Sequence, residues 1–197
     1  MLESLEEQAR RYATRAHAEA GQRRKYTDEP YIVHPTAVAE LVRSVSTDDA
    51  LLATAWLHDT VEDTDTTLAD IESHFGARVA QLVGMLTDSA QPQAKNRAAR
   101  KLAHFRHTAE ASPEAQTVKL ADIIDNTRAI VRFDPHFARI YLVEKRVQIQ
   151  LLKQGDAQLW QQASAIIEQG IAQLGQPPYS VPESWFVKQA AKYSGLS

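Results

Sequence analysis

The chain has 197 residues, the length of one domain, and its 44% hydrophobic and 24% charged residues are typical of a globular protein. A formal net charge of −3 argues against a protein that coats nucleic acid, and the absence of cysteine excludes disulfide bonds and thiolate ligands to a metal. The segment MLESLEEQARR lacks the apolar core of an export signal and no stretch is long enough to span a membrane, so we expect a cytoplasmic protein without a membrane partner.

The first half of the chain is predicted to consist of helices. Apolar residues at spacings of three and four predict a first helix that begins near Leu2 and stops at Gly21. In His34-Pro35 the proline suits the first position of a second helix, so His34 is expected at the N-terminal end of that helix. Ser46 or Thr47 is expected to cap a strongly apolar third helix. Two shorter helices are expected from Thr66 or Thr67 to near Gly76 and over 79–86.

The second half carries similar start and stop signals. Residues 88–95 are expected to form a loop and the basic segment 96–110 an exposed helix. Capping residues and prolines then mark further helices, which we expect from Ser112-Pro113, over 135–154 after Asp134-Pro135, from Asp156 to Leu174, and over 183–193. No segment alternates apolar and polar residues as a strand does, and no repeat is found. We therefore predict an all-α fold in a single domain.

One cluster of titratable residues lies near the end of the apolar third helix. His58 and Asp59 are adjacent, and Glu62 and Asp63 follow four residues after each of them. If the helix continues for one more turn, this spacing places the second pair over the first. Each residue taken alone is more simply interpreted as a solvated surface group. Acidic residues crowded at the C-terminal end of a helix are unfavourable, however, and a bound cation would relieve that repulsion.

A second constellation contains Lys119, Asp122, Asp125, Asn126 and Arg128. Its ordinary interpretation is a salt-bridged helix surface. The apolar residues from Leu120 to Ile124 favour a mostly buried helix instead, and a buried carboxylate needs a partner such as a metal. Asp122 is therefore the stronger metal-binding candidate of the two aspartates.

Basic residues are concentrated in two segments in spite of the negative net charge. One segment is Arg23, Arg24 and Lys25, and the other comprises Lys95, Arg97, Arg100, Lys101 and Arg106. Either segment leaves room for a local site that binds an anion.

The order His34, His58-Asp59, Asp122 resembles the HD phosphohydrolase superfamily. The stretches AHAEAGQRRK, EPYIVHPTAVAELV, LHDTVEDTDTTL, HFGARVAQLV and VKLADIIDN are similar to the hydrolase domain of the RelA/SpoT enzymes, above all to its stand-alone form, the small alarmone hydrolases. The motif-bearing core covers about residues 16–130, whereas the helices over about 135–193 show few matching motifs. The resemblance implies one compact helical HD domain over residues 1–197.

The resemblance also implies roles for individual residues. His34, His58, Asp59 and Asp122 would be the ligands of one metal ion per chain, usually Mn²⁺, although other divalent metals are compatible with two imidazoles and two carboxylates. Glu62 and Asp63 match the catalytic pair that handles the attacking water. Arg24, Lys25 and Asn126 match residues on the substrate side of the site. Without the resemblance, a solvated basic turn and a surface amide would be the ordinary interpretations of these three.

The implied activity is that of a pyrophosphohydrolase, which removes the 3′-pyrophosphate from guanosine alarmones such as ppGpp to give GDP or GTP and pyrophosphate. Two departures from the family pattern, Asp125 and the segment Tyr26-Thr27-Asp28-Glu29, are both expected to lie near the nucleotide and leave the substrate open. An adenosine alarmone, the 2′-phosphate of NADPH or a deoxynucleotide monophosphate are alternatives, and a nucleotide sensor without turnover is another. The expected partner is a small nucleotide rather than nucleic acid, and both a monomer and a homodimer fit the sequence.

Overall fold

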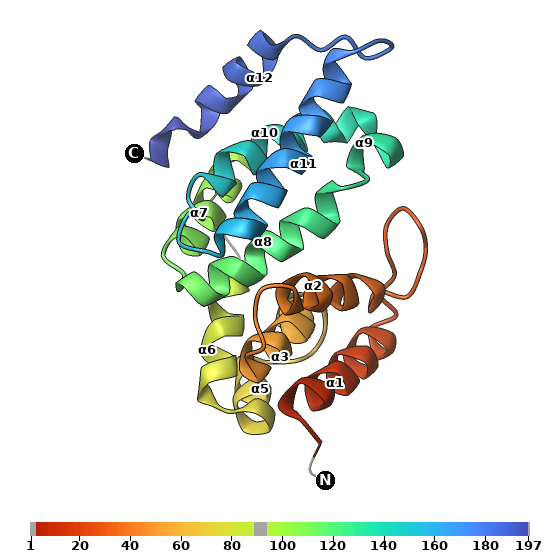
Figure 1. The fold of residues 1–197 in the computed structure, drawn as a ribbon, viewed down its shortest axis with the longest axis vertical. Coiled ribbons are helices and arrows are strands. Elements are labelled where there is room, and N and C mark those ends of the chain that lie inside the picture. Colours follow the sequence, from red (N-terminus) through yellow and green to blue (C-terminus); the bar gives the residue numbers. More distant parts are fainter. Residues whose placement is uncertain (1–2, 89–93, 197) are drawn as a thin grey trace.

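The computed structural model describes residues 3–88 and 94–196, and in these parts of the chain it contains helices and no strand (Figure 1). The predicted all-α fold is confirmed. The α-helices are α1 Leu5–Glu19, α2 Val33–Arg43, α3 Asp49–Leu57, α4 Thr60–Asp63, α5 Leu68–Phe75, α6 Ala77–Leu86, α7 Arg97–Ala109, α8 Pro113–Thr127, α9 Ile130–Phe133, α10 Pro135–Ile149, α11 Ala157–Gly175 and α12 Glu183–Ala190, followed by the 3₁₀ helix η1 Ala191–Leu196. Among the described residues, no helix combines the length and the apolar character that a membrane crossing needs.

Most helices begin at the kind of capping residue that the sequence indicates. A side-chain oxygen accepts a backbone N–H of the first turn at Ser4, Thr67, Asn96, Ser112, Asp134 and Asp156. The start of α3 differs from the prediction, because Asp48, rather than Ser46 or Thr47, accepts the N–H of Ala50 at 3.0 Å. Gly21 ends α1 as expected, and its φ of 64° is the left-handed conformation that favours glycine.

The apolar helix does not continue past His58. α3 ends at Leu57, His58 and Asp59 form a turn, and α4 begins at Thr60. The Thr60 hydroxyl donates a hydrogen bond to the carbonyl oxygen of Leu57 at 2.7 Å, which satisfies one of the carbonyl groups left unpaired at the helix end. Glu62 therefore does not stack over His58 within one helix, and the pairs are arranged by the turn instead.

Several other boundaries also differ from the prediction. α2 begins at Val33, which puts Pro35 at the third helical position rather than the first. α10 ends at Ile149 instead of residue 154, and turns follow as far as Gly155. The last predicted helix, 183–193, is divided between α12 and η1, and the short helices α4 and α9 are absent from the prediction. Within the predicted loop 88–95, residues 89–93 lie outside the described residues, and the other three are not helical.

The core forms around α3 and α8. Every residue of α3 from Leu51 to Leu57 is buried, and the helix packs against α1, α2 and α6. α8 packs against α2 on one side and against α11 on the other, so it lies between the N-terminal and C-terminal groups of helices in Figure 1. Gly155 lets the turn before α11 approach α8, because a Cβ there would lie 2.8 Å from Leu120 Cδ1 and 3.1 Å from the α8 backbone. The predicted site residues lie where α2, α3 and α8 meet.

Candidate active site

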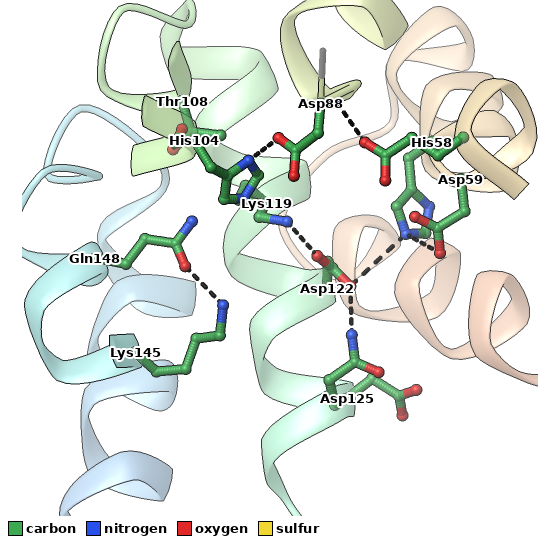
Figure 2. A network of polar contacts seen from close by, with 12 residues as sticks. His58, Asp59, Asp88, His104, Thr108, Lys119, Asp122, Asp125, Lys145 and Gln148 are labelled. Carbon is green, nitrogen blue, oxygen red and sulfur yellow. Dashed lines mark hydrogen bonds and ion pairs between the residues drawn. The ribbon is translucent and has the colours of Figure 1, made fainter. Parts of the chain in front are cut away.

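The four predicted metal ligands converge from three places in the fold. His34 lies near the start of α2, His58 and Asp59 form the turn after α3, and Asp122 lies in the middle of α8. His34 Nε2 is 3.1 Å from Asp122 Oδ1 and 3.6 Å from Asp59 Oδ2. His58 Nε2 is 3.2 Å from Asp59 Oδ2 and 3.7 Å from Asp122 Oδ1. Figure 2 shows His58, Asp59 and Asp122 turned toward one another. Two nitrogens and two oxygens of the kind that bind a divalent metal therefore share one small volume.

The Nδ1 atom of each imidazole lies beside a hydrogen-bond acceptor. His58 Nδ1 lies 2.7 Å from the carbonyl oxygen of Ala55, and His34 Nδ1 lies 2.6 Å from Asp125 Oδ2. Nδ1 therefore carries a hydrogen in both rings, and Nε2 is the nitrogen that a metal would bind in place of a proton. His58 Nε2 is buried and has no hydrogen-bond partner among the described residues. This arrangement fits a metal site, because histidine ligands usually donate their other N–H to a carboxylate or a backbone carbonyl.

Mutual attraction of charges dominates the electrostatics of the cluster. Burial lowers the pKa of His58, but the Asp59 and Asp122 carboxylates outweigh it and raise the pKa well above the ordinary value. Burial raises the pKa of both aspartates, but His58 lowers that of Asp59 and Lys119 lowers that of Asp122, so both carboxylates are ionised. The cluster therefore attracts positive charge, and protons compete with a metal for it.

Three further side chains fix the orientation of the two carboxylates. The Tyr31 hydroxyl donates a hydrogen bond to Asp59 Oδ2 at 2.5 Å. Lys119 Nζ donates to Asp122 Oδ2 and Asn126 Nδ2 to Asp122 Oδ1, both at 2.7 Å. Asp122 is only 6% exposed, and its position is therefore determined by protein groups rather than by solvent.

A cavity of about 620 Å³ opens beside the cluster. Its volume lies within the range of small-molecule sites, about 300–1,000 Å³. Six of the predicted site residues line it: Arg24, Lys25, Asp59, Glu62, Asp122 and Asn126. A ligand in the cavity would therefore lie directly beside the two carboxylates of the cluster.

The predicted catalytic pair, Glu62 and Asp63, lies on the short helix α4. Glu62 lines the cavity and accepts a hydrogen bond from the backbone N–H of Asp88. Burial and the neighbouring Asp59 carboxylate raise the pKa of Glu62 to about 7, the range in which a carboxylate serves as a general base at neutral pH. Asp63 does not line this cavity but lines a neighbouring hollow beside Arg15, which Glu62 lines as well. Glu62 therefore faces both hollows, whereas Asp63 lines only the neighbouring one.

The predicted substrate-side residues lie at one end of the cavity. Arg24 Nη1 donates to Asn126 Oδ1 at 3.2 Å, which connects this arginine through Asn126 to Asp122. Lys25 Nζ lies 5.0 Å from the centre of the Tyr26 ring, and Tyr26 stacks on Phe133 with ring centres 5.7 Å apart and planes inclined by 6°. This end therefore combines two cations with aromatic faces, which suits a phosphorylated nucleoside.

Comparison with known proteins identifies the family. Residues 9–150 match the HD domain family. The chain belongs to the HD-domain family. It is 43% identical over 123 residues to the guanosine-3′,5′-bis(diphosphate) 3′-pyrophosphohydrolase MESH1 of Mus musculus, covering 61% of this chain and 67% of the relative. The MESH1 of Homo sapiens is 42% identical over 127 residues, with 63% and 68% covered. A solved structure described as a metazoan ortholog of SpoT that hydrolyzes ppGpp superposes with a TM-score of 0.75 at 30% identity and covers 86% of this chain and 97% of that one.

The sequence analysis named Lys101 and Lys119 but missed Lys145, and it did not predict that the three lysines line one cavity of this HD domain. Lys101 from α7, Lys119 from α8 and Lys145 from α10 line it together with His104. Lys145 lies three residues after Leu142 and four before Ile149, both buried, so the helical period places it on the buried face of α10. This spacing is the sequence signal that could have identified Lys145 as a buried residue. Asp125 was expected near the nucleotide; it lines the cavity, but its Oδ2 also holds His34.

Proposed function

We propose that this HD-domain protein is a manganese-dependent hydrolase that removes the 3′-pyrophosphate from guanosine alarmones such as ppGpp, giving GDP or GTP and pyrophosphate. The main support is that two imidazole Nε2 atoms and two carboxylate oxygens lie close together beside a cavity lined by cations. The relatives named guanosine-3′,5′-bis(diphosphate) 3′-pyrophosphohydrolase support the same activity.

His34, His58, Asp59 and Asp122 would hold the metal ion. Two imidazoles and two carboxylates are suitable ligands for Mn²⁺, and the hydrogen bonds at Nδ1 orient both rings so that Nε2 faces the ion, which would displace a proton there. When bound, a divalent metal lowers the pKa of a coordinated water and polarises a phosphoryl oxygen. The Tyr31 hydroxyl on Asp59 restrains one carboxylate of this set.

Glu62 would accept the proton of the attacking water. It lies in the cavity, one helical turn after Asp59, and its pKa of about 7 balances the fraction of ionised carboxylate against its basicity at neutral pH. Its hydrogen bond with the backbone N–H of Asp88 restrains the side chain. Asp63 would assist Glu62 from the neighbouring hollow, which both residues line.

Arg24 and Lys25 would bind phosphate groups of the substrate at the aromatic end of the cavity. The Tyr26 and Phe133 rings there offer faces against which a purine could stack. Asn126 is already bonded to Arg24 and Asp122, so it is suited to exchange the Arg24 contact for a ribose or phosphate oxygen.

The test is chromatographic product analysis with a panel of substrates. The Mn²⁺-loaded protein is incubated with ppGpp, pppGpp, their adenosine counterparts, NADPH and a deoxynucleotide monophosphate, beside His58→Ala as a variant without one ligand. Pyrophosphate release from the guanosine alarmones that is lost in His58→Ala supports the proposal. Cleavage of only another nucleotide would replace the substrate, and tight binding of ppGpp without any product would make the protein a sensor instead of an enzyme.

A further inference from the structure

Lysines gather in the cavity on the side of Asp122 opposite to Arg24. On α8, Lys119 lies one turn before Asp122, whereas Asn126, the partner of Arg24, lies one turn after it. Lys101 and Lys145 line the cavity on the Lys119 side. Figure 2 shows Lys119 and Lys145 reaching into the space between α8 and α10, with His104 beside them. We refer to Lys101, Lys119 and Lys145 as the lysine cluster.

The buried member of this cluster has no anionic partner among the described residues. Lys145 is 7% exposed, and its Nζ donates to the neutral Gln148 Oε1 at 2.8 Å and lies 5.2 Å from the centre of the Tyr141 ring. The adjacent Glu144 is already engaged, because Arg97 Nε and the Tyr193 hydroxyl both donate to its Oε1, at 2.8 and 3.0 Å, and Arg97 Nη2 donates to its Oε2 at 3.0 Å. The charge of Lys145 is therefore uncompensated.

The other charges around the cluster do not supply the missing anion. Lys119 is paired with Asp122 at 2.7 Å, and Asp122 is a predicted metal ligand. Asp88 and Glu62 line the same cavity, but the Asp88 carboxylate contacts His104 and its backbone N–H bonds Glu62. Burial and repulsion by Lys119 and Lys101 lower the pKa of Lys145 to about 7, which agrees with a cation held without a counter-charge. Burying such a charge is costly unless a ligand completes the site.

We infer that the lysine cluster is the subsite for the distal phosphate of a 3′-pyrophosphate, so that it selects substrates with a diphosphate over those with a monophosphate at this position. This inference rests on the proposed function and names the residues that would recognise the pyrophosphate group that is transferred to water. In the reaction, water adds to the phosphorus bonded to the ribose 3′ oxygen and that P–O bond breaks. The water loses a proton, the 3′ oxygen gains one, and pyrophosphate leaves. The distal phosphate lies one P–O–P link beyond the attacked phosphorus, on the side that the lysine cluster occupies if the nucleoside occupies the Tyr26 end.

The charge distribution supports this orientation. Cations lie on both sides of the predicted metal ligands, with Arg24 and Lys25 at one end and the lysine cluster at the other. A nucleotide with separate 5′ and 3′ phosphate groups carries negative charge at two ends, which matches that arrangement. A 3′-monophosphate would reach the metal position but would leave Lys145 without its counter-charge.

The subsite is tested by binding rather than by turnover. Isothermal titration calorimetry on the Mn²⁺-loaded protein compares methylenediphosphonate, a diphosphate that cannot be hydrolysed, with methylphosphonate. Charge-assisted hydrogen bonds contribute about 1.5–3 kcal/mol, so Lys145→Gln is expected to weaken diphosphonate binding about tenfold or more. Binding of methylphosphonate is expected to stay unchanged, and Lys145→Arg, which keeps the charge, is expected to retain part of the diphosphonate affinity.

Lys192→Gln is the matched control, because Lys192 also donates to a glutamine three residues away but is exposed on η1. Thermal unfolding verifies that each variant is folded. If Lys145→Gln and Lys101→Gln both bind the diphosphonate as wild type does, the subsite is wrong, even where ppGpp is hydrolysed. If diphosphonate binding depends on Lys145 and ppGpp is left intact, the subsite stands and the proposed function fails.

Discussion

Asp125 is expected to determine metal affinity through His34, although it is not itself a predicted ligand. Its Oδ2 lies 2.6 Å from His34 Nδ1, and His34 is 0% exposed, so this carboxylate and not solvent holds the ring in the native protein. In Asp125→Ala the Nδ1–H loses its acceptor and the ring is free to rotate or to exchange tautomers. Loss of such an outer partner typically weakens metal binding about 10- to 100-fold, which corresponds to about 1.4–2.7 kcal/mol.

The assay is isothermal titration calorimetry, in which Mn²⁺ is added to the metal-free protein. Arg128→Ala is the control, since Arg128 Nη2 contacts the other carboxylate oxygen of Asp125 at 3.1 Å and its side chain is 47% exposed. It is expected to bind Mn²⁺ nearly as wild type does, and Asp125→Asn, which keeps an acceptor oxygen, is expected to lie between wild type and Asp125→Ala. Wild-type affinity in a folded Asp125→Ala variant would refute the role of Asp125.

Four further predictions concern catalysis, the pH dependence of stability, an ion pair with a buried glutamate, and a close approach. Glu62→Gln is expected to lower kcat about 10²- to 10⁴-fold with Mn²⁺ binding retained. The pKa of Glu62 is raised from 4.5 to about 7, so its contribution to the stability of the metal-free fold is present below pH 4.5 and is lost as the pH rises through 7. The midpoint of thermal unfolding should therefore decline less over this pH range in Glu62→Gln than in wild type. An equal decline in both proteins would contradict the shift. Glu144→Ala removes the buried acceptor of Arg97 and of the Tyr193 hydroxyl and is expected to cost about 1–3 kcal/mol in urea unfolding, because Arg97 is 43% exposed and water can solvate it. Glu7→Ala at an exposed pair is expected to change little. Gly155→Ala places a Cβ 2.8 Å from Leu120 Cδ1 and is expected to cost about 1–3 kcal/mol; an unchanged midpoint would show that the turn can move away from α8.

The helices were predictable because their signals are local. Capping side chains such as Asn96 and Asp156, proline at the starts of α8 and α10 and the left-handed Gly21 act within a few residues of the boundary they determine. The break at His58-Asp59 has no such signal, since neither glycine nor proline occurs there. It is stabilised in part by a contact with a distant part of the chain, the hydrogen bond from the Tyr31 hydroxyl to Asp59, which a local pattern does not contain.

The site was predictable to a different degree in its different parts. The predicted ligands His34, His58, Asp59 and Asp122 form a motif in chain order, and the structure brings them together. The residues that hold them are less visible, because the contact of Asp125 with His34 joins positions 91 residues apart. Lys101 was noted only as part of a basic segment. Two other residues of that segment form contacts away from the cavity: Arg97 donates to Glu144, and Arg106 donates to the carbonyl of Gly195. Charge along a sequence does not reveal which cations share a cavity.

The central claim is that water attacks the 3′-phosphoryl group of an alarmone at the cluster formed by His34, His58, Asp59 and Asp122. It is tested most directly by incubating the Mn²⁺-loaded protein with ppGpp in ¹⁸O-labelled water and analysing the products by mass spectrometry, with Asp59→Ala beside it. We expect GDP without label, pyrophosphate that carries one ¹⁸O atom, and no product from Asp59→Ala. Release of orthophosphate, label in GDP, unchanged turnover in Asp59→Ala or intact ppGpp would contradict it.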